Sequence, residues 1–441
     1  MQRRRQFILG SLGTVGIAAI SGCTSTGGSD TTTEPLTRPS QLTQSSKTTA
    51  EDGDSEDVFG YSVAVSGDGS TAIVGAPNIR TPGDENPNED NAGSAYVFSG
   101  TSGSWTLDGK LTAKNGDSYD HFGASVAVSE DGSTAIVGAG RDADPNGDIV
   151  GSAYVFSGTS GSWTQEAKLT AEDGDSYDHF GFSVAVSGDG STAIVGANRD
   201  ADPNGDIVGS AYVFSGTSGS WTQDAKLTAE DGDADDNFGE SVAVSSDGST
   251  AIVGNSFDDD PNGDSAGSAY VFSGTDGPWT QEAKLTAEDG DADDNFGESV
   301  AVSEDGSTAI VGNFFDDDPN GDSAGSAYVF SGTSGSWTQD AKLTAEDGDS
   351  DDIFGKSVAV SSDGSAAMVG APGDEAGSAY VFSGTGGSWT QTGKLTAEDG
   401  DSGDFFGDSV AVSSDGSAAM VGAPGDEDPN GYNAGSAYVF E

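Results

Sequence analysis

Short runs of β-branched and aromatic residues, bounded by Gly, Asp and Ser, recur along the chain after its first forty residues. Four such runs form one unit, and in the fifth copy they lie at Ser299–Ser303, Thr308–Gly312, Ala327–Phe330 and Trp337–Thr344. Runs of this kind between turn-forming residues predict β-strands. The apolar spacing typical of helices is not found after residue 30. The pattern therefore predicts an all-β protein built from four-stranded units.

A Phe-Gly pair opens each unit and gives the number of copies. The pairs begin at Phe59, Phe122, Phe180, Phe238, Phe296, Phe354 and Phe406. Consecutive four-stranded units of about 57 residues are typical of propeller blades. Seven copies predict a seven-bladed β-propeller over residues 42–441.

The two ends of the repeat region are complementary. The last copy stops at Glu441 after its third strand, whereas Leu42–Ala50 aligns with the fourth strand of the other copies. An N-terminal outer strand that completes the last blade would close the ring and leave few unpaired strand edges. An open β-solenoid is the alternative architecture, but it would not need complementary half-blades at its ends.

The N-terminus has the features of an export signal. Arg4, Arg5 and Phe7 form the Arg-Arg-x-Phe core of a twin-arginine signal, which is an address recognised by a receptor. The apolar run from Phe7 to Ile20 is too short to span a bilayer comfortably and suits the hydrophobic part of a signal peptide. These residues predict that the protein is exported.

The only cysteine, Cys23, stands at the end of this run after Ile-Ser-Gly. The segment resembles a lipobox, whose cysteine receives a lipid and becomes the mature N-terminus. Residues 1–23 are then a signal peptide, and the protein is held by its lipid at the outer face of the cell membrane. The alternative is a simple membrane anchor with an incidental cysteine. Residues 24–41 are rich in Thr, Ser and Gly and predict a flexible linker.

The chain is strongly acidic, with 74 Asp and Glu against 16 Lys and Arg and a formal net charge of −58. Such a surface is expected of a protein that works in concentrated salt, where counterions screen its self-repulsion. A cation-binding face is the alternative explanation. Nucleic acid is not expected as a partner, because the basic footprint that it requires is missing.

Phe-Gly, then Ser-Val-Ala-Val, then Val-Gly-Ala-Pro resembles the FG-GAP repeat of integrin α subunits. Gly-Ala-Pro is complete at Gly75–Pro77, Gly370–Pro372 and Gly422–Pro424. The later Gly-Ser-Ala-Tyr-Val-Phe and Ser-Trp-Thr-Gln segments are similar to the variant of microbial surface proteins, here with a lipoprotein signal. The resemblance implies a β-propeller, but it does not imply one function, because propellers serve many roles.

Integrin-type repeats can hold calcium in the turn between their first two strands. That turn is Ser303–Ser307 in the fifth copy and contains only two adjacent acids, so the family's calcium site cannot be transferred to it. The loop between the second and third strands is richer in acids and carries Asp-x-Asp-Pro-Asn-Gly-Asp four times. The oxygen-bearing residues are Asp142, Asp144, Asn146 and Asp148; Asp200, Asp202, Asn204 and Asp206; Asp258, Asp260, Asn262 and Asp264; and Asp316, Asp318, Asn320 and Asp322.

Oxygen ligands at alternate positions followed by Gly form the first half of a calcium-binding loop. The closing bidentate Glu is absent, since the twelfth position is Ala, as at Ala269. Acids of the loop that joins two blades, such as Asp289 and Asp291, could supply the missing oxygens. The alternative is a Pro-Asn-Gly turn flanked by acids adapted to salt. Calcium is thus a possible ligand, and no other cofactor is indicated.

The remaining candidates for chemistry are weaker. The six Trp recur at one position of the repeat, which favours packing over a sugar platform. His121 and His179 precede Phe-Gly at a position where other copies have Asn237, Asn295 or Ile353, which argues against a catalytic or metal role. The sequence contains no Ser/His/Asp set, Cys/His cluster or Gly-rich phosphate loop.

These features favour an exported, lipid-anchored and non-enzymatic binding or adhesion module of the cell surface. We expect its partner to be a cell-surface protein or an envelope polysaccharide, and the protein itself to be a monomer that touches the membrane only through its lipid. One alternative is a polysaccharide-processing or other enzyme on a propeller scaffold, which a distinct set of polar residues in the central channel would favour. Another is a passive structural component of the envelope.

Overall fold

The computed structural model describes residues 42–78, 92–101, 103–159, 161–217, 219–259, 262–275, 278–317, 320–333, 335–427 and 430–441. The regular secondary structure of these residues consists of 28 strands in seven four-stranded antiparallel sheets. Arg4, Arg5, Phe7, Cys23 and the predicted linker 24–41 lie outside the described residues. The described residues include no helix long and apolar enough to cross a membrane.

Each sheet is one blade, and its strands follow one another from the axis outward. Blades 1 to 3 are β2 (Val63–Val65), β3 (Thr71–Ala76), β4 (Ser94–Thr101) and β5 (Ser104–Leu111); β6 (Val126–Val128), β7 (Thr134–Ala139), β8 (Ser152–Thr159) and β9 (Ser162–Leu169); and β10 (Ser183–Val186), β11 (Thr192–Ala197), β12 (Ser210–Thr217) and β13 (Ser220–Leu227). Blades 4 to 6 are β14 (Val242–Val244), β15 (Thr250–Asn255), β16 (Ser268–Ser273) and β17 (Thr280–Leu285); β18 (Val300–Val302), β19 (Thr308–Asn313), β20 (Ser326–Thr333) and β21 (Ser336–Leu343); and β22 (Val358–Val360), β23 (Ala366–Ala371), β24 (Ser378–Thr385) and β25 (Ser388–Leu395). Blade 7 is β26 (Ser409–Val412), β27 (Ala419–Ala423), β28 (Ser436–Phe440) and β1 (Gln44–Thr48).

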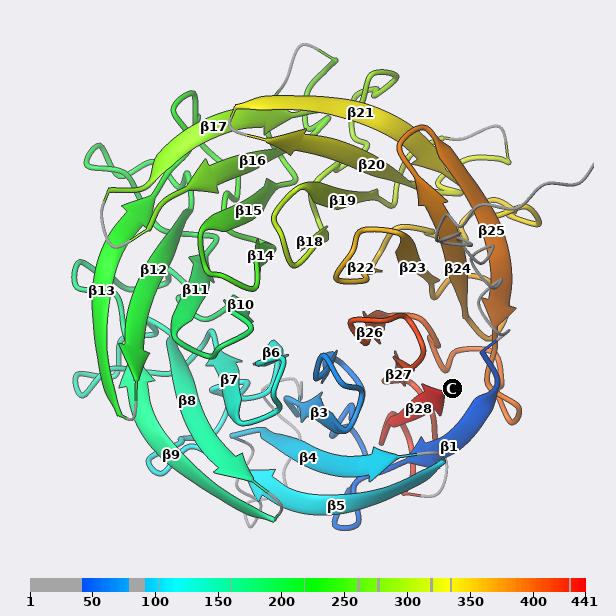
Figure 1. Cartoon of the computed structure of the whole chain (residues 1–441). Helices are drawn as coiled ribbons and strands as arrows, with labels where there is room; N and C mark the ends of the chain where they lie inside the picture. Colours follow the sequence, from blue (N-terminus) through cyan, green and yellow to red (C-terminus); the bar gives the residue numbers. More distant parts are fainter. Residues whose placement is uncertain are drawn as a thin grey trace, which may run out of the picture. The chain divides into compact units, whose positions relative to one another are not determined.

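Figure 1 shows the blades arranged around a central axis, with the short first strands innermost and β1, β5, β9, β13, β17, β21 and β25 at the rim. The seven-bladed β-propeller predicted from the repeats is therefore confirmed. The described residues form closed four-stranded blades, so no open solenoid is present in that part of the chain.

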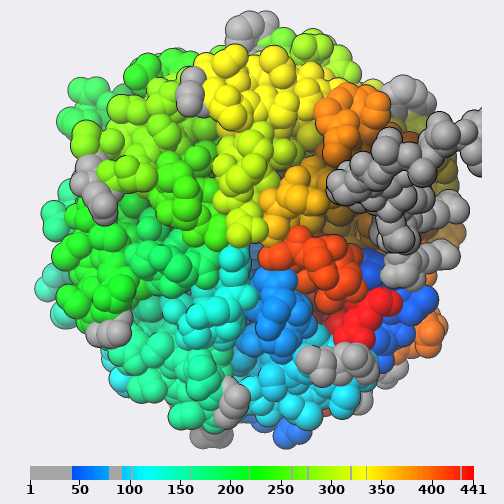
Figure 2. Space-filling model, viewed as in Figure 1, coloured from blue at the N-terminus to red at the C-terminus, as the bar shows by residue number. Residues whose placement is uncertain are grey.

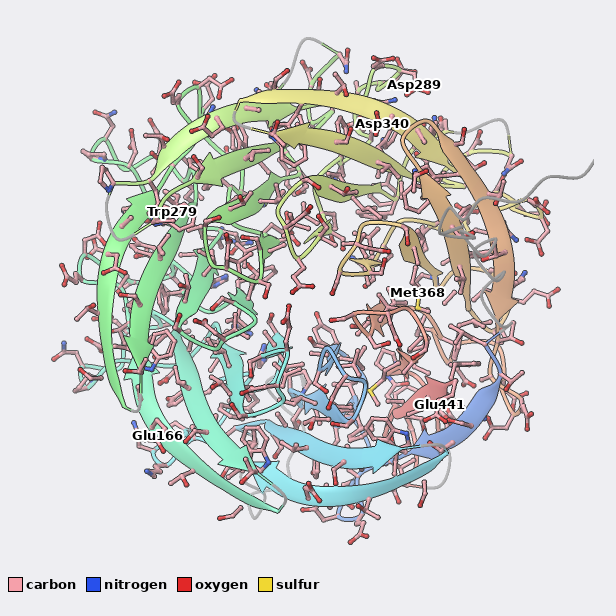
Figure 3. All side chains as sticks on the ribbon, in the orientation of Figure 1. Glu166, Trp279, Asp289, Asp340, Met368 and Glu441 are labelled. Atoms are coloured by element: carbon pink, nitrogen blue, oxygen red, sulfur yellow. The ribbon has the colours of Figure 1, made fainter. Side chains whose placement is uncertain are left out.

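The N-terminal strand β1 closes the ring by pairing with the C-terminal strand β28. Lys47 lies opposite Tyr438 and Thr48 opposite Ala437, in an antiparallel register. The backbones of Thr43 and Glu441 exchange two hydrogen bonds of 3.0 Å just beyond the strands, and Figure 3 shows Glu441 beside β1. The predicted closure by Leu42–Ala50 is confirmed, with β1 as its regular part.

The apolar core lies between neighbouring blades rather than in one centre. Each of seven buried clusters combines residues of two adjacent blades, for example Val97 of blade 1 with Val126 and Phe122 of blade 2. The Phe of each Phe-Gly pair contacts the Tyr and Phe of the third strand in an edge-on or tilted arrangement, as Phe59 contacts Tyr96 at 5.4 Å between ring centroids. Every blade has two such interfaces. Closure of the ring brings the last blade against the first and thereby buries the apolar side chains between them.

The recurring Trp residues pack at the rim, as predicted. Trp163 lies against Gly158 of its own hairpin and Gly109 of the preceding blade, and it contacts the cluster between blades 1 and 2. Trp279 does the same for blades 3 and 4 and lies near the outer strands in Figure 3.

A ring of seven backbone hydrogen bonds joins the blades around the axis. In each blade, a Ser follows the first strand, and the residue after this Ser donates its backbone N–H to the backbone carbonyl of the equivalent residue in the next blade, at 2.9 to 3.1 Å. The ring runs through Gly67, Glu130, Gly188, Ser246, Glu304, Ser362 and Ser414 and back to Gly67. It borders an axial cavity of about 150 Å³. Figure 2 shows the blades meeting closely around the axis, with only a narrow opening between them.

A glycine of each second strand permits close approach of the next blade, which leads to a prediction. A Cβ at Gly254 would lie 1.9 Å from O of Gly297, whereas a Cβ at Gly393 would meet nothing closer than Val381 at 3.9 Å. Gly254→Ala is expected to cost about 3 kcal/mol or more of folding free energy, because the backbone of the next blade must move. Gly393→Ala is expected to stabilise the protein by about 0.5–1 kcal/mol. Thermal unfolding of both variants checks this pair, and equal effects would contradict it.

Candidate functional site

The longer loops gather on one face of the propeller, which we call the loop face. In each blade, the Gly at the end of the loop between the second and third strands forms a β-bridge with the Phe of the next blade's Phe-Gly pair. Gly93 bridges to Phe122 in this way, and Gly435 of the last blade bridges to Phe59 of the first. The opposite face, the turn face, carries tight turns such as Ser66–Ser70. In that turn Asp68 accepts hydrogen bonds from the Ser66 hydroxyl at 2.8 Å and from the Ser70 N–H at 2.9 Å. The carboxylate is thus occupied by its own turn.

The first Asp of each candidate calcium motif is bound to a lysine and a tyrosine. In blade 3, Asp200 is 2.7 Å from Nζ of Lys226 and accepts a hydrogen bond of 2.7 Å from Tyr212. Asp173, from the loop that joins blades 2 and 3, lies on the other side of the same ammonium at 2.8 Å. Lys226 also sits 5.3 Å from the centroid of the Tyr212 ring. The lysine therefore takes the place between the two loops that a cation would need.

The same lysine cluster recurs in every blade. Its lysines are Lys110, Lys168, Lys226, Lys284, Lys342, Lys394 and Lys47. Asp142, Asp258 and Asp316 are the counterparts of Asp200 in blades 2, 4 and 5. Figure 3 shows Asp289, which pairs with Lys342 at 2.9 Å, at the outer edge of the ring. The clusters connect the loop face to the outer strands. Because their acids are bound to lysine, these acids do not direct free oxygens at a common point.

The later residues of the motif point elsewhere. Asp144 accepts hydrogen bonds from the backbone N–H groups of Asn146 and Asp148 at 2.7 and 3.0 Å, and Asp202 repeats this with Asn204 and Asp206. Asn262 and Asn320 instead donate to the carbonyls of Ala287 and Ala345. Asp264 and Asp322 accept backbone N–H groups at their carbonyls, and Asp260 and Asp318 lie outside the described residues.

Among the described residues, no three His, Cys, Asp or Glu side chains converge in a way that could hold a metal. The first two motifs form Asx turns at Asp144 and Asp202, and the first Asp of all four motifs is paired with a lysine. The described oxygens of the motifs are therefore not arranged around one point. A calcium loop needs several oxygens around one point, and the motif's side chains diverge.

A set of unlike residues surrounds the axis at the loop face. These residues, the axial ring, directly follow the Phe-Gly pairs and are Tyr61, Ala124, Phe182, Glu240, Glu298, Lys356 and Asp408. Lys356 of blade 6 forms an ion pair of 2.7 Å with Glu298 of blade 5 and lies 4.8 Å from the centroid of the Phe314 ring. Glu240 accepts a short hydrogen bond from the Ser256 hydroxyl. Blades that are nearly identical in their cores therefore differ at the axis.

The charges of the axial ring influence one another across several blades. Burial raises the pKa of Glu240, and the nearby Glu298 carboxylate raises it further. Burial also raises the pKa of Asp408, against the opposing field of Lys356. Burial lowers the pKa of Lys356, but Glu298 and Asp408 more than offset this, so the ammonium is held charged. Acids with raised pKa values beside a fixed cation are typical of functional sites.

Exposed aromatic side chains flank the axial ring. Tyr61 and Phe182 belong to the ring and are 38% and 40% exposed. Phe257 and Phe315 follow the second strands of blades 4 and 5, and Phe405 precedes the last Phe-Gly pair; all three are exposed. Large apolar side chains that remain exposed close together mark binding surfaces.

The axial ring was not among the residues predicted from the sequence. Its signal was present, because the position after Phe-Gly changes chemical class from copy to copy. The position before Phe-Gly, with His121 and His179, varies as well. Both imidazoles are half-buried. Burial lowers the pKa of each to about 4, with a smaller contribution from Arg141 in both cases, so they are neutral at physiological pH.

The fold and this arrangement define a class: a seven-bladed β-propeller with a uniform scaffold and an asymmetric axial site on one face. Comparison with protein families matches the FG-GAP repeat at residues 42–98, 105–156, 163–214, 221–272, 279–330, 337–382 and 389–440. The chain belongs to the FG-GAP repeat family. No curated protein matches the chain.

Proposed function

We propose that the protein is a non-enzymatic binding module of the cell surface that takes its partner at the axial ring of the loop face. The observation that carries this proposal is the chemistry of the ring, which combines Tyr61, Phe182, Lys356 and acids on blades whose cores repeat one pattern. Packing explains the repeated residues, but it does not require these differences. A specific ligand does require them, because it presents unlike groups around the axis.

The partner in this proposal is a cell-surface protein or an envelope polysaccharide. Aromatic faces beside hydrogen-bonding acids suit either, since they pack on apolar surface and accept hydrogen bonds from hydroxyl or amide groups. Propellers of one fold serve many functions, so the site rather than the fold supports this choice.

The site of action in the proposal is the outer face of the membrane in concentrated salt. Arg4, Arg5 and Phe7 support export, Cys23 supports a lipid anchor, and the net charge of −58 supports a high-salt environment. Mass spectrometry of the protein from its native cells should find a lipid on an N-terminal Cys23. An intact N-terminus would exclude the anchor.

Capture of envelope components by the full-length chain tests the axial site. Tyr61→Ala combined with Lys356→Gln is expected to reduce the captured amount about tenfold or more, because the double variant lacks the exposed aromatic side chain of Tyr61 and the ammonium of Lys356. Tyr177→Ala is the matched control, since Tyr177 is 62% exposed but does not belong to the axial ring. If both variants capture as much as the unmodified chain, the axial site is not the binding site.

An enzyme acting on polysaccharide is a second candidate, favoured by the distinct polar residues of the axial ring and by Glu240 among them. Its raised pKa beside the Glu298–Lys356 ion pair suits a general acid. Incubation with envelope polysaccharide followed by a reducing-end assay separates the candidates. Release of new ends that Glu240→Gln abolishes would favour the enzyme over the binding module.

A further inference from the structure

Most positive charges of the described propeller are engaged by its own residues. The chain has only 16 Lys and Arg, and seven lysines lie in the lysine clusters. Lys356 pairs with Glu298, and Lys114 donates to the carbonyl of Gln165 at 3.1 Å. Arg141 and Arg199 are different: both are exposed, and neither pairs with a carboxylate of the described chain.

The two arginines occupy the same place on neighbouring blades. Each follows the second strand of its blade, and their backbone N–H groups donate to the backbone carbonyls of Asp120 and Asp178, at 3.2 Å in both blades. A Cβ at Gly140 would lie 3.4 Å from Cα of Phe182, so the chain at Arg141 runs against the Phe-Gly segment of blade 3. Both guanidinium groups also lower the pKa of His179, after burial. Arg141 and Arg199 therefore flank one segment, which carries Phe182.

The acids next to the arginines in sequence do not neutralise them. Asp142 is 2.8 Å from Lys168, and Asp200 is 2.7 Å from Lys226. Asp144 and Asp202 bind the N–H groups of their own turns. Among the described residues of this acidic chain, two guanidinium groups on neighbouring blades are thus left available for a ligand.

We propose that Arg141 and Arg199 bind the anionic group of an acidic glycan, a uronate carboxylate or a sulfate ester, while Phe182 packs on the sugar ring. A guanidinium group presents a planar fork of donors that matches such oxyanions. Phe182, 40% exposed beside them, offers an aromatic face for a sugar ring. This inference rests on the proposed function and selects an acidic polysaccharide as the partner.

The net charge of the protein does not oppose this ligand in concentrated salt. At about 1 M ionic strength the Debye length is about 3 Å, so only charges in contact act on one another. A slender glycan chain can place an anionic group against the arginines without covering the acidic loops. An acidic protein would bring a broad surface over those loops, which favours the glycan.

Calorimetric titration of the full-length chain in molar KCl tests the inference. The probes are polygalacturonate for the carboxylate, dextran sulfate for the sulfate ester and neutral dextran as the uncharged polymer. We expect binding of one or both acidic polymers and none of neutral dextran. Arg141→Gln combined with Arg199→Gln is expected to weaken that binding about tenfold or more. Lys114→Gln, which removes an exposed cation from the loop between blades 1 and 2, should leave it unchanged.

The results separate this inference from the proposed function. No binding of either acidic polymer, or equal binding by the double arginine variant and the unmodified chain, overturns the inference. Binding of neutral dextran as tight as that of the acidic polymers also overturns it. If the inference fails while envelope capture still depends on Tyr61 and Lys356, the axial binding site stands. Unchanged melting temperatures show that the variants are folded, since both arginines are exposed.

Discussion

A chain that begins at residue 51 is expected to lose the cooperative unfolding transition of the propeller. It lacks β1, so the hydrogen-bonding edge of β28 is left unpaired over Ala437–Phe440. It also lacks Lys47, which lies 2.7 Å from Asp426, a carboxylate whose side chain is only 6% exposed. Leaving a buried charge without its partner costs about 3–5 kcal/mol, and an open edge strand promotes association between chains. Circular dichroism during heating and size-exclusion chromatography check this result.

A chain that begins at residue 40 is the control, because it keeps β1 and removes only the segment before it. It should melt as the full-length chain does. Lys47→Met in the full-length chain separates the two contributions, since it keeps the strand but removes the ammonium. We expect an intermediate loss for Lys47→Met. Cooperative unfolding at an unchanged temperature in the chain from residue 51 would contradict closure by β1.

The blades and their number could be predicted from the sequence because each copy repeats the residues that make its core. Phe59 and its counterparts, together with the Tyr and Phe of the third strand, recur without change, and they are the residues that pack between blades. Closure could be predicted for the same reason, since Leu42–Ala50 carries the pattern of a fourth strand. Repetition of packing residues determines the architecture.

The contacts of the acidic loops, in contrast, could not be predicted from the sequence. The spacing of Asp200, Asp202 and Asn204 suits a calcium loop, but a motif does not reveal which cation is near. Tyr212 and Lys226 lie opposite each other on β12 and β13, and this pairing brings the ammonium to Asp200. The relevant lysine is 26 residues away in sequence, so only the register of the strands brings it to the loop.

The contacts within the axial ring could not be predicted for a related reason. Lys356 and Glu298 are 58 residues apart, and they meet because equivalent positions of adjacent blades converge at the axis. Comparison of the copies with one another identifies such a position when its chemistry varies while its neighbours do not. In a closed repeat protein, positions that vary between copies are therefore candidates for the site, and constant positions form the core.

The free energy of unfolding is expected to be highest at mildly acidic pH. Burial raises the pKa of Asp120, Asp178, Asp236 and Asp294 to about 6, and a neighbouring aspartate adds to each rise. In the unfolded chain these carboxyls have a pKa near about 3.9. The folded protein therefore binds more protons in the interval between these values. The stability that they contribute is complete below about pH 4 and is lost as the pH rises through 6.

The lysine clusters determine how the free energy of unfolding falls at low pH. Burial alone would raise the pKa of Asp231 and Asp289, but hydrogen bonds from Lys and Tyr more than offset it and hold each pKa below its usual value. Groups of this kind stabilise the fold above the unfolded pKa, and their contribution is lost as the pH falls through the folded one. The maximum is thus expected between about pH 4 and pH 6.

Thermal unfolding in molar KCl across this range checks the prediction, with Asp294→Asn as the informative variant. Asn is neutral at every pH and its side-chain oxygen can still accept the Asp291 N–H, which Asp294 binds at 2.8 Å. The variant should be more stable than the unmodified chain at about pH 7.5, by on the order of 1–3 kcal/mol, and nearly equal to it at about pH 4.5. The adjacent Asp293 is exposed, so Asp293→Asn should show no such dependence. A stability that rises steadily from pH 5 to 8 would mean that these four carboxyls are not held protonated by the fold.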